Sequence, residues 1–157
     1  NYYRIIMNLE LLNKSNLSTP KFTLNGNIYI AKCVKCYDAD TIHIVIYLYN
    51  KLQRFVCRLL NIDTAEIRSK NINEKNIALN GKKYLQELIL DKLIIVKCYD
   101  FDKYGRLLVY IYLKNNKIQN LKYNYDNSIN KLLVDKKFGY EYYGGNKITF
   151  EEWFINT

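Results

Sequence analysis

Apolar and polar residues alternate in the middle of the chain in a way that predicts β-strands. Between residues 41 and 49 every second side chain is Ile or Leu, so one face of an extended segment would be apolar. Neighbouring runs rich in β-branched and aromatic residues have strand length and are separated by short polar breaks. The predicted strands are 28–37, 41–49, 52–60, 93–99 and 107–113.

Apolar residues at helical spacing predict helices at about 74–90 and 128–137, and a short terminal helix beginning at Thr149. Residues 2–13 also have helical spacing, and a linker follows them. We therefore expect an extension at residues 1–27 and one domain at residues 28–157. Its predicted class is mainly β with α (α+β), a small, partly open five-stranded barrel packed by two or three helices.

The 157 residues include 24 Lys and Arg against 15 Asp and Glu, a formal net charge of +9. A basic chain favours a polyanionic partner such as nucleic acid or an acidic membrane surface. Lysine alone is weak support, because the codon bias of an AT-rich genome also raises its share. Arginine is scarce, with only five in the chain, so each arginine is a stronger candidate for a specific role.

Histidine and cysteine content limits the metal chemistry. His43 is the one histidine, which excludes sites that need two or three imidazoles, so a hydrolase here would use carboxylates and a hard metal ion. Cys33 and Cys36 form a Cys-x-x-Cys pair without a second such pair to complete a zinc site. In a strand their odd separation would point the two sulfurs to opposite faces. We therefore expect the four cysteines to be reduced and in or near the core.

The N-terminal stretch is too short and too polar to span a membrane, because Arg4, Asn8 and Glu10 interrupt it. It also lacks the apolar centre and cleavage site of a signal peptide. Reduced cysteines favour an intracellular compartment, although the sequence leaves the localisation open. We expect a monomer with no stable membrane association.

Three groups of charged residues interrupt or end the apolar strands. The first is Asp38-x-Asp40, whose carboxylates would project on the same side of an extended segment and could serve a hard cation such as Ca²⁺ or Mg²⁺. The alternative is an ordinary Asp-Ala-Asp turn.

The second group runs from Arg58 to Glu66. Arg58 lies within a predicted strand, where a guanidinium either pairs with a buried carboxylate or faces a functional cavity. Asp63 could supply a further metal oxygen, and Glu66 could act as a base. The alternative for Asp63-Thr-x-Glu66 is a helix or turn cap.

The third group is Asp102-Lys103-Tyr104-Gly105-Arg106. Its lysine, tyrosine and arginine offer a point charge, a stacking ring and a bidentate fork, a set suited to phosphate. The alternative is a solvated, charged hairpin tip, which would be the favoured interpretation if this group stood alone.

Taken together, the order and spacing of the three groups resemble the staphylococcal nuclease (thermonuclease) family, over about residues 28–143. The resemblance implies a five-stranded oligonucleotide-binding (OB-fold) barrel with packed helices. It also implies Ca²⁺-dependent cleavage of DNA and RNA with little sequence specificity, leaving 3′-phosphate and 5′-hydroxyl ends. Mg²⁺ or Mn²⁺ are possible substitutes for Ca²⁺, and the expected substrate is single-stranded or locally frayed.

The resemblance also implies a role for individual residues. Asp40, Asp63 and the Thr64 carbonyl match ligands of the metal ion. Asp38 matches a residue that supports these ligands without binding the ion itself. Glu66 matches the group that activates the attacking water, while Arg58 and Arg106 match the arginines that stabilise charge on phosphorus. The residues that match the nucleotide-binding set are Lys103, Tyr104, Tyr140 and Tyr142, with Tyr143 competing for the last two positions.

Two departures from the family pattern concern the expected activity. Ala65 stands where the family usually has Pro, which predicts a less rigid loop before Glu66. The connection from Tyr99 to Asp102 is also shorter than usual.

The rival hypothesis is a non-catalytic OB-fold module that binds single-stranded nucleic acid through basic and aromatic groups, which the 16 tyrosines make plausible.

Overall fold

The computed structural model describes residues 2–114 and 123–155, with side chains from residue 8 onward. Its strands form a barrel, against which α2 and α3 pack. The strands are β1 (Ile28–Cys36), β2 (Thr41–Leu48), β3 (Lys51–Leu59), β4 (Ile62–Thr64), β5 (Leu93–Phe101), β6 (Leu107–Leu113) and β7 (Gly139–Glu141). The helices are α1 (Tyr2–Asn13), α2 (Ile72–Ile89), α3 (Ile129–Asp135) and α4 (Phe150–Ile155).

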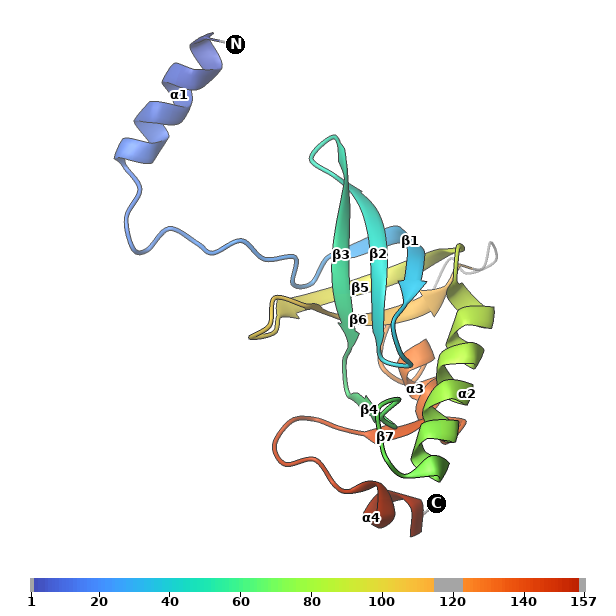
Figure 1. Cartoon of the computed structure of the whole chain (residues 1–157). Helices are drawn as coiled ribbons and strands as arrows, with labels where there is room; N and C mark the ends of the chain where they lie inside the picture. Colours follow the sequence, from blue (N-terminus) through green and yellow to red (C-terminus); the bar gives the residue numbers. More distant parts are fainter. Residues whose placement is uncertain (1, 115–122, 156–157) are drawn as a thin grey trace.

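Five strands close into a barrel in the order β1-β2-β3-β6-β5, with β5 returning to pair with β1 (Figure 1). All neighbours are antiparallel except β3 and β6, which run parallel. The predicted five-stranded barrel is confirmed, but it is closed rather than partly open, because β3 pairs with β6 and β5 with β1. The contact that closes it is short, because β3 and β6 pair only from Cys57 with Leu107 to Leu59 with Val109.

Alternating inward-facing side chains build the barrel interior, most regularly in β2. In β2, the side chains of Ile42, Ile44 and Ile46 are at most 1% exposed, as the period-two pattern predicts. Burying a side chain of this size stabilises the fold by about 1.5–3 kcal/mol relative to leaving it exposed. The remaining buried interior includes Ala31, Cys33, Cys57, Leu59, Ile94, Val96, Cys98, Leu107, Val109 and Ile111.

Helix α2 lies against β1 and begins where its sequence supplies a cap. The Asn71 side chain accepts the backbone N–H groups of Asn73 and Glu74 at 2.9 and 3.3 Å, which satisfies two of the free donors of the first turn. The buried positions recur every three to four residues, which fixes one face of the helix on the barrel. They are Ala78, Gly81, Leu85 and Ile89.

Helix α3 closes the end of the barrel next to β6 and is anchored by a buried amide. The Asn130 side chain donates to the carbonyls of Leu60 and Val109, both at 2.9 Å, and accepts the Ile111 N–H at 3.2 Å. Ser128 caps this helix by accepting the N–H of Lys131. One buried side chain therefore joins α3 to β6 and to the end of β3.

The sequence did not predict β4 and β7, which form a separate two-stranded sheet. Each has three residues, and their register pairs Asp63 with Tyr140 and Thr64 with Gly139. Three residues are too few for a periodic pattern, so only the pairing itself reveals them. This small sheet links the end of β3 to the C-terminal segment.

The structure confirms the predicted burial of the cysteines and contradicts the predicted directions of Cys33 and Cys36. All four cysteines are free thiols in the core. Cys33 and Cys36, however, do not face opposite sides: both side chains are buried and their sulfurs lie 3.9 Å apart. The reason is an irregularity in the β1–β2 register between Cys33 and Lys35, which adds a residue and resets the alternation.

The segment before the barrel is partly attached to it. Leu24 is buried in the core, and the Gly26 N–H donates to the Cys98 carbonyl at 2.9 Å. Helix α1 lies apart from the barrel at the end of an extended stretch (Figure 1). Within the residues that the structure describes, no helix combines the length and apolar character needed to cross a membrane.

We predict that Asn130→Ala lowers the free energy of unfolding by about 3 kcal/mol, because buried backbone groups of Leu60, Val109 and Ile111 lose a partner. Chemical denaturation measures the change. Asn80→Ala, an exposed position on α2, is the matched control and should stay within about 0.5 kcal/mol. Equal stability of the two variants would contradict the anchoring role of Asn130.

Candidate functional site

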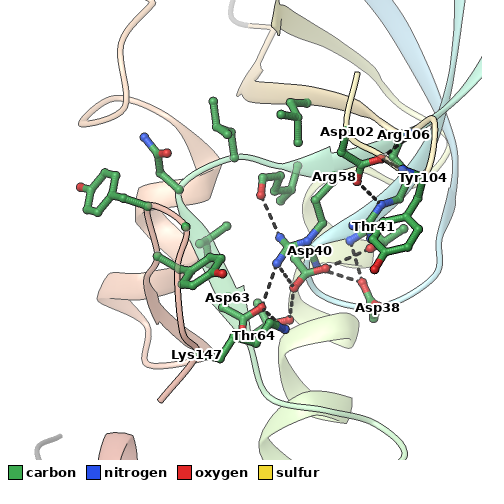
Figure 2. Close-up of a pocket in the computed structure, with 18 of the residues that line it drawn as sticks. Asp38, Asp40, Thr41, Arg58, Asp63, Thr64, Asp102, Tyr104, Arg106 and Lys147 are labelled. Carbon is green, nitrogen blue, oxygen red and sulfur yellow. Dashed lines mark hydrogen bonds and ion pairs between the residues drawn. The ribbon is translucent and has the colours of Figure 1, made fainter. Parts of the chain in front are cut away.

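A cavity of about 600 Å³ opens at one end of the barrel, where several chain turns converge (Figure 2). Four segments form its wall: the β1–β2 turn, the stretch from the end of β3 through β4, the β5–β6 turn, and the loop after β7. Its charged lining comprises Asp38, Asp40, Arg58, Asp63, Glu66, Asp102, Lys103, Arg106 and Lys147. The three charged groups singled out in the sequence therefore face one cavity.

Arg58 lies at the centre of this wall and holds two carboxylates. Its Nη2 atom is 2.9 Å from Asp63 Oδ1 and 3.1 Å from Asp40 Oδ2, and its Nη1 atom donates to the Leu59 carbonyl at 2.8 Å. The Arg58 side chain is only 12% exposed. A buried guanidinium is costly without such partners, and the two ion pairs offset that cost.

Asp40 is further fixed by two threonine hydroxyls. Thr41 Oγ1 donates to Asp40 Oδ1 at 2.9 Å, and Thr64 Oγ1 donates to Oδ2 at 2.7 Å. Since Thr41 begins β2 and Thr64 ends β4, the two hydroxyls tie the carboxylate to both segments. Asp40 Oδ2 thus accepts from Thr64 and pairs with Arg58.

Asp38 shapes the turn that presents Asp40. Its Oδ1 atom accepts the N–H groups of Asp40 and Thr41 at 3.0 and 2.6 Å, an Asx-type turn. Burial, and then the nearby Asp40 carboxylate, raise the pKa of Asp38 to about 6 despite these bonds. Asp38 therefore forms the turn that the sequence offered as an alternative, and it also lines the cavity.

Asp63 has two partners that lie late in the chain. Lys147 Nζ is 2.8 Å from Asp63 Oδ1, and the Tyr140 hydroxyl donates to Oδ2 at 3.1 Å. Burial and Asp63 raise the pKa of Tyr140 to about 12. Burial lowers the pKa of Lys147, but the carboxylates of Asp63 and Glu66 outweigh it and the net shift is upward. Lys147 was not predicted, because no motif surrounds it.

The β5–β6 turn forms another part of the wall. Asp102 accepts the N–H groups of Tyr104 and Arg106, each at 2.9 Å, and Arg106 Nε lies 2.7 Å from Asp102 Oδ2. Burial raises the pKa of Asp102, but these donors outweigh it and hold that pKa below its usual value. Lys103 and Arg106 both lie over the Tyr104 ring, at 5.1 and 5.5 Å from its centre. The turn therefore presents two cations and an exposed ring, as Figure 2 shows for Tyr104 and Arg106.

The remaining predicted residues divide between the cavity and its surroundings. Glu66 is exposed on the loop after β4 and lines the cavity, and its backbone N–H donates to Glu74 at 3.2 Å. Tyr142 and Tyr143 both line the cavity. Tyr140 lies behind Asp63, against a smaller neighbouring hollow, and packs on Trp153 with ring centres 6.0 Å apart.

The donors available to a cation are oxygens. Asp40 and Asp63 meet at one Arg58 nitrogen, and threonine hydroxyls border Asp40. No cluster of three or more His, Cys, Asp or Glu side chains suited to a metal occurs among the side chains described, those of residues 8–114 and 123–155. The donor set fits a hard cation that completes its shell with backbone oxygens and water, as Ca²⁺ does, and does not fit zinc.

Gly139 allows β7 to approach β4 closely beside Asp63. A Cβ atom at residue 139 would overlap the Asp63 carbonyl oxygen and meet Thr64 Cγ2 at 3.0 Å. This glycine is therefore required by the β4–β7 pairing rather than by a turn. No sequence motif marked it, because the contact joins segments that are distant along the chain.

This chain is similar to known proteins over much of its length. The family model described as “Staphylococcal nuclease homologue” matches residues 56–144. The uncharacterized protein MJ1439 of Methanocaldococcus jannaschii is 32% identical over 123 residues. That similarity covers 62% of this chain and 58% of the relative, so the chain spans less than two thirds of the relative's length.

We predict that Gly139→Ala separates β4 from β7, lowers the free energy of unfolding by about 1–3 kcal/mol, and shifts the emission of Trp153, which packs on Tyr140. Denaturation and intrinsic fluorescence measure the two effects. Gly26→Ala is the control, because a Cβ there meets open space and only the left-handed backbone is penalised. Unchanged emission in Gly139→Ala would refute the predicted displacement.

The raised pKa of Asp38 predicts a pH-dependent stability in metal-free buffer. The unfolded chain loses this proton near pH 4 and the folded chain near pH 6, so stability falls as the pH rises through that window. Asp38→Asn keeps an acceptor oxygen but cannot titrate, so its stability relative to the wild type should increase from pH 4 to pH 7. Thermal unfolding at several pH values measures this, with Glu87→Gln on the exposed face of α2 as control. Parallel curves for wild type and Asp38→Asn would show that the prediction is wrong.

Proposed function

The chain belongs to the staphylococcal nuclease homologue family, and on that premise we propose that it is a divalent-cation-dependent nuclease. Its proposed reaction is hydrolysis of phosphodiester bonds in DNA and RNA with little sequence specificity. The products would carry 3′-phosphate and 5′-hydroxyl ends. The supporting observation is the convergence of Asp40 and Asp63 on Arg58 in a cavity that also receives Glu66 and Arg106.

In this proposal Asp40, Asp63 and the Thr64 carbonyl hold the cation, for which Ca²⁺ is the first candidate and Mg²⁺ or Mn²⁺ are substitutes. When bound, the cation supplies positive charge that offsets the anionic phosphate. Asp38 keeps the turn that orients Asp40. Lys147 would leave Asp63 when the cation binds, because both require the same carboxylate.

Glu66 is proposed to orient the attacking water and accept its proton. It is the exposed carboxylate of the cavity wall, whereas Asp40 and Asp63 are buried and already paired. A carboxylate that is free of a strong cation partner can form a hydrogen bond to water and remove its proton. Its anchor is the backbone contact with Glu74 on α2, which limits the movement of the Ala65–Glu66 loop.

Arg58 and Arg106 are proposed to stabilise the charge that develops as phosphorus becomes five-coordinate. Donors held in advance by the protein are effective because they need little reorganisation during the reaction. Arg58 is held by two aspartates and Arg106 by Asp102, so both forks are oriented before substrate arrives. Lys103, Tyr104 and Tyr142 would contact phosphate and base, and Tyr140 would act indirectly through Asp63.

The test is cleavage of single-stranded DNA with Ca²⁺, with chelator, and with the variant Glu66→Gln. We expect the wild type to cut with Ca²⁺ only, and Glu66→Gln to cut about 10² to 10⁴ times more slowly, because the base is lost while the fold is kept. Glu87→Gln removes an exposed carboxylate of α2 and should cut like the wild type. If the wild type binds DNA but never cuts it with Ca²⁺, the chain is a single-strand-binding module and the nuclease proposal fails.

A further inference from the structure

The outer face of β1, β2 and β3 continues away from the cavity, and the register defines which residues lie on it. Thr41 pairs with Arg58 at the cavity, and the next outward pair is His43 with Val56. One step further, Val45 pairs with Arg54. Since Ile42 and Ile44 fill the barrel interior, these alternate residues face outward. Figure 1 shows the three strands side by side along this face.

Basic side chains occupy this face. Lys35 pairs with His43 across β1 and β2 and is exposed, and Arg54 is exposed on β3. Burial lowers the pKa of His43, and the positive charges of Lys35 and Arg54 lower it further. Arg54 and Arg58 are four residues apart on one strand, about 13 Å at 3.3 Å per residue.

An aromatic ring joins this face to the cavity. Tyr37 is 46% exposed, Lys35 Nζ lies 5.8 Å from its ring centre, and Arg68 Nη2 donates to its hydroxyl at 3.1 Å. Tyr37 directly precedes Asp38, and Arg68 follows Glu66 by two residues, and both Asp38 and Glu66 line the cavity. The basic face is thus continuous with the cavity wall.

The charges on this face lack acidic partners in the described part of the chain. The salt bridges between residues 8–114 and 123–155 include Lys32 with Asp91, but none uses Lys35, Arg54 or Arg68. A solvated lysine alone would mean little in a lysine-rich chain. Two of only five arginines, Arg54 and Arg68, are among these charges, however, and Arg68 donates to the hydroxyl of the exposed Tyr37.

We propose that Lys35, Tyr37, His43, Arg54 and Arg68 form a second binding surface for the sugar–phosphate backbone of single-stranded nucleic acid, next to the phosphate held in the cavity. The proposal rests on the proposed function and extends it. Cations spaced along a strand match successive phosphates, and an exposed ring between cations offers a base a stacking platform. Because the surface extends about 13 Å beyond Arg58, a substrate must be longer than a dinucleotide to use it.

The test compares Lys35→Glu and Arg54→Glu with Lys136→Glu, an exposed lysine after α3 that gives the same change of charge elsewhere. Fluorescence anisotropy measures the binding of a labelled oligothymidylate in chelator, over a range of salt, so the result does not depend on cleavage. We expect Lys35→Glu and Arg54→Glu to bind several-fold more weakly. The slope of log K against log salt should become shallower by about 0.7 for each phosphate that the variant no longer neutralises.

Two further measurements separate the possible failures. Calorimetry with a dinucleotide should give the same affinity for these variants as for the wild type, and their unfolding temperatures should be unchanged. If the oligonucleotide affinities equal that of Lys136→Glu, or if binding to anionic phosphatidylserine vesicles is lost while oligonucleotide binding is kept, the second surface is refuted. A wild type that binds DNA but does not cut it would refute the nuclease proposal alone.

Discussion

Two carboxylates share one guanidinium nitrogen, and the architecture around the cavity depends on that contact. Arg58 must project outward from β3, Asp40 must reach it from the turn before β2, and Asp63 must return to it from β4. The Leu59 N–H donates to the Asp40 carbonyl at 2.7 Å, so the backbone holds the same register as the charges. A slip of one residue in β3 would turn Arg58 into the apolar interior, at the cost of an unpaired buried charge.

The barrel could be predicted because its strands carry period-two patterns long enough to detect. The isoleucines of β2 are the clearest case, and the predicted limits of the five barrel strands lie within two residues of the observed ones. The charged groups that line the cavity could be picked out because charges that interrupt or end apolar strands are costly and therefore conspicuous. The role proposed for each residue came instead from the resemblance to a family. Arg58 stands between Cys57 and Leu59, both buried, and only a specific partner makes that position tolerable.

Other features depend on contacts that no local pattern encodes. The β4–β7 pair joins residues about eighty positions apart, and each strand is too short to show a period. The bulge after Cys33 reverses the expected direction of one thiol, and the extra residue is visible only from the pairing with β2. Lys147 reaches Asp63 from a loop that follows two glycines with positive φ, and nothing in its own neighbourhood marks it.

Gly139 carries no functional group, yet the position of Asp63 requires it. Residues of this kind are invisible to any search that ranks side chains by their chemistry. In a collection of random variants, substitutions at position 139 would group with those at Asp63 rather than with those at ordinary loop glycines such as Gly26. The site is therefore defined by the space between two backbones as much as by charge. A designer who moves the charged residues onto another barrel must also place a glycine where the second strand approaches the aspartate.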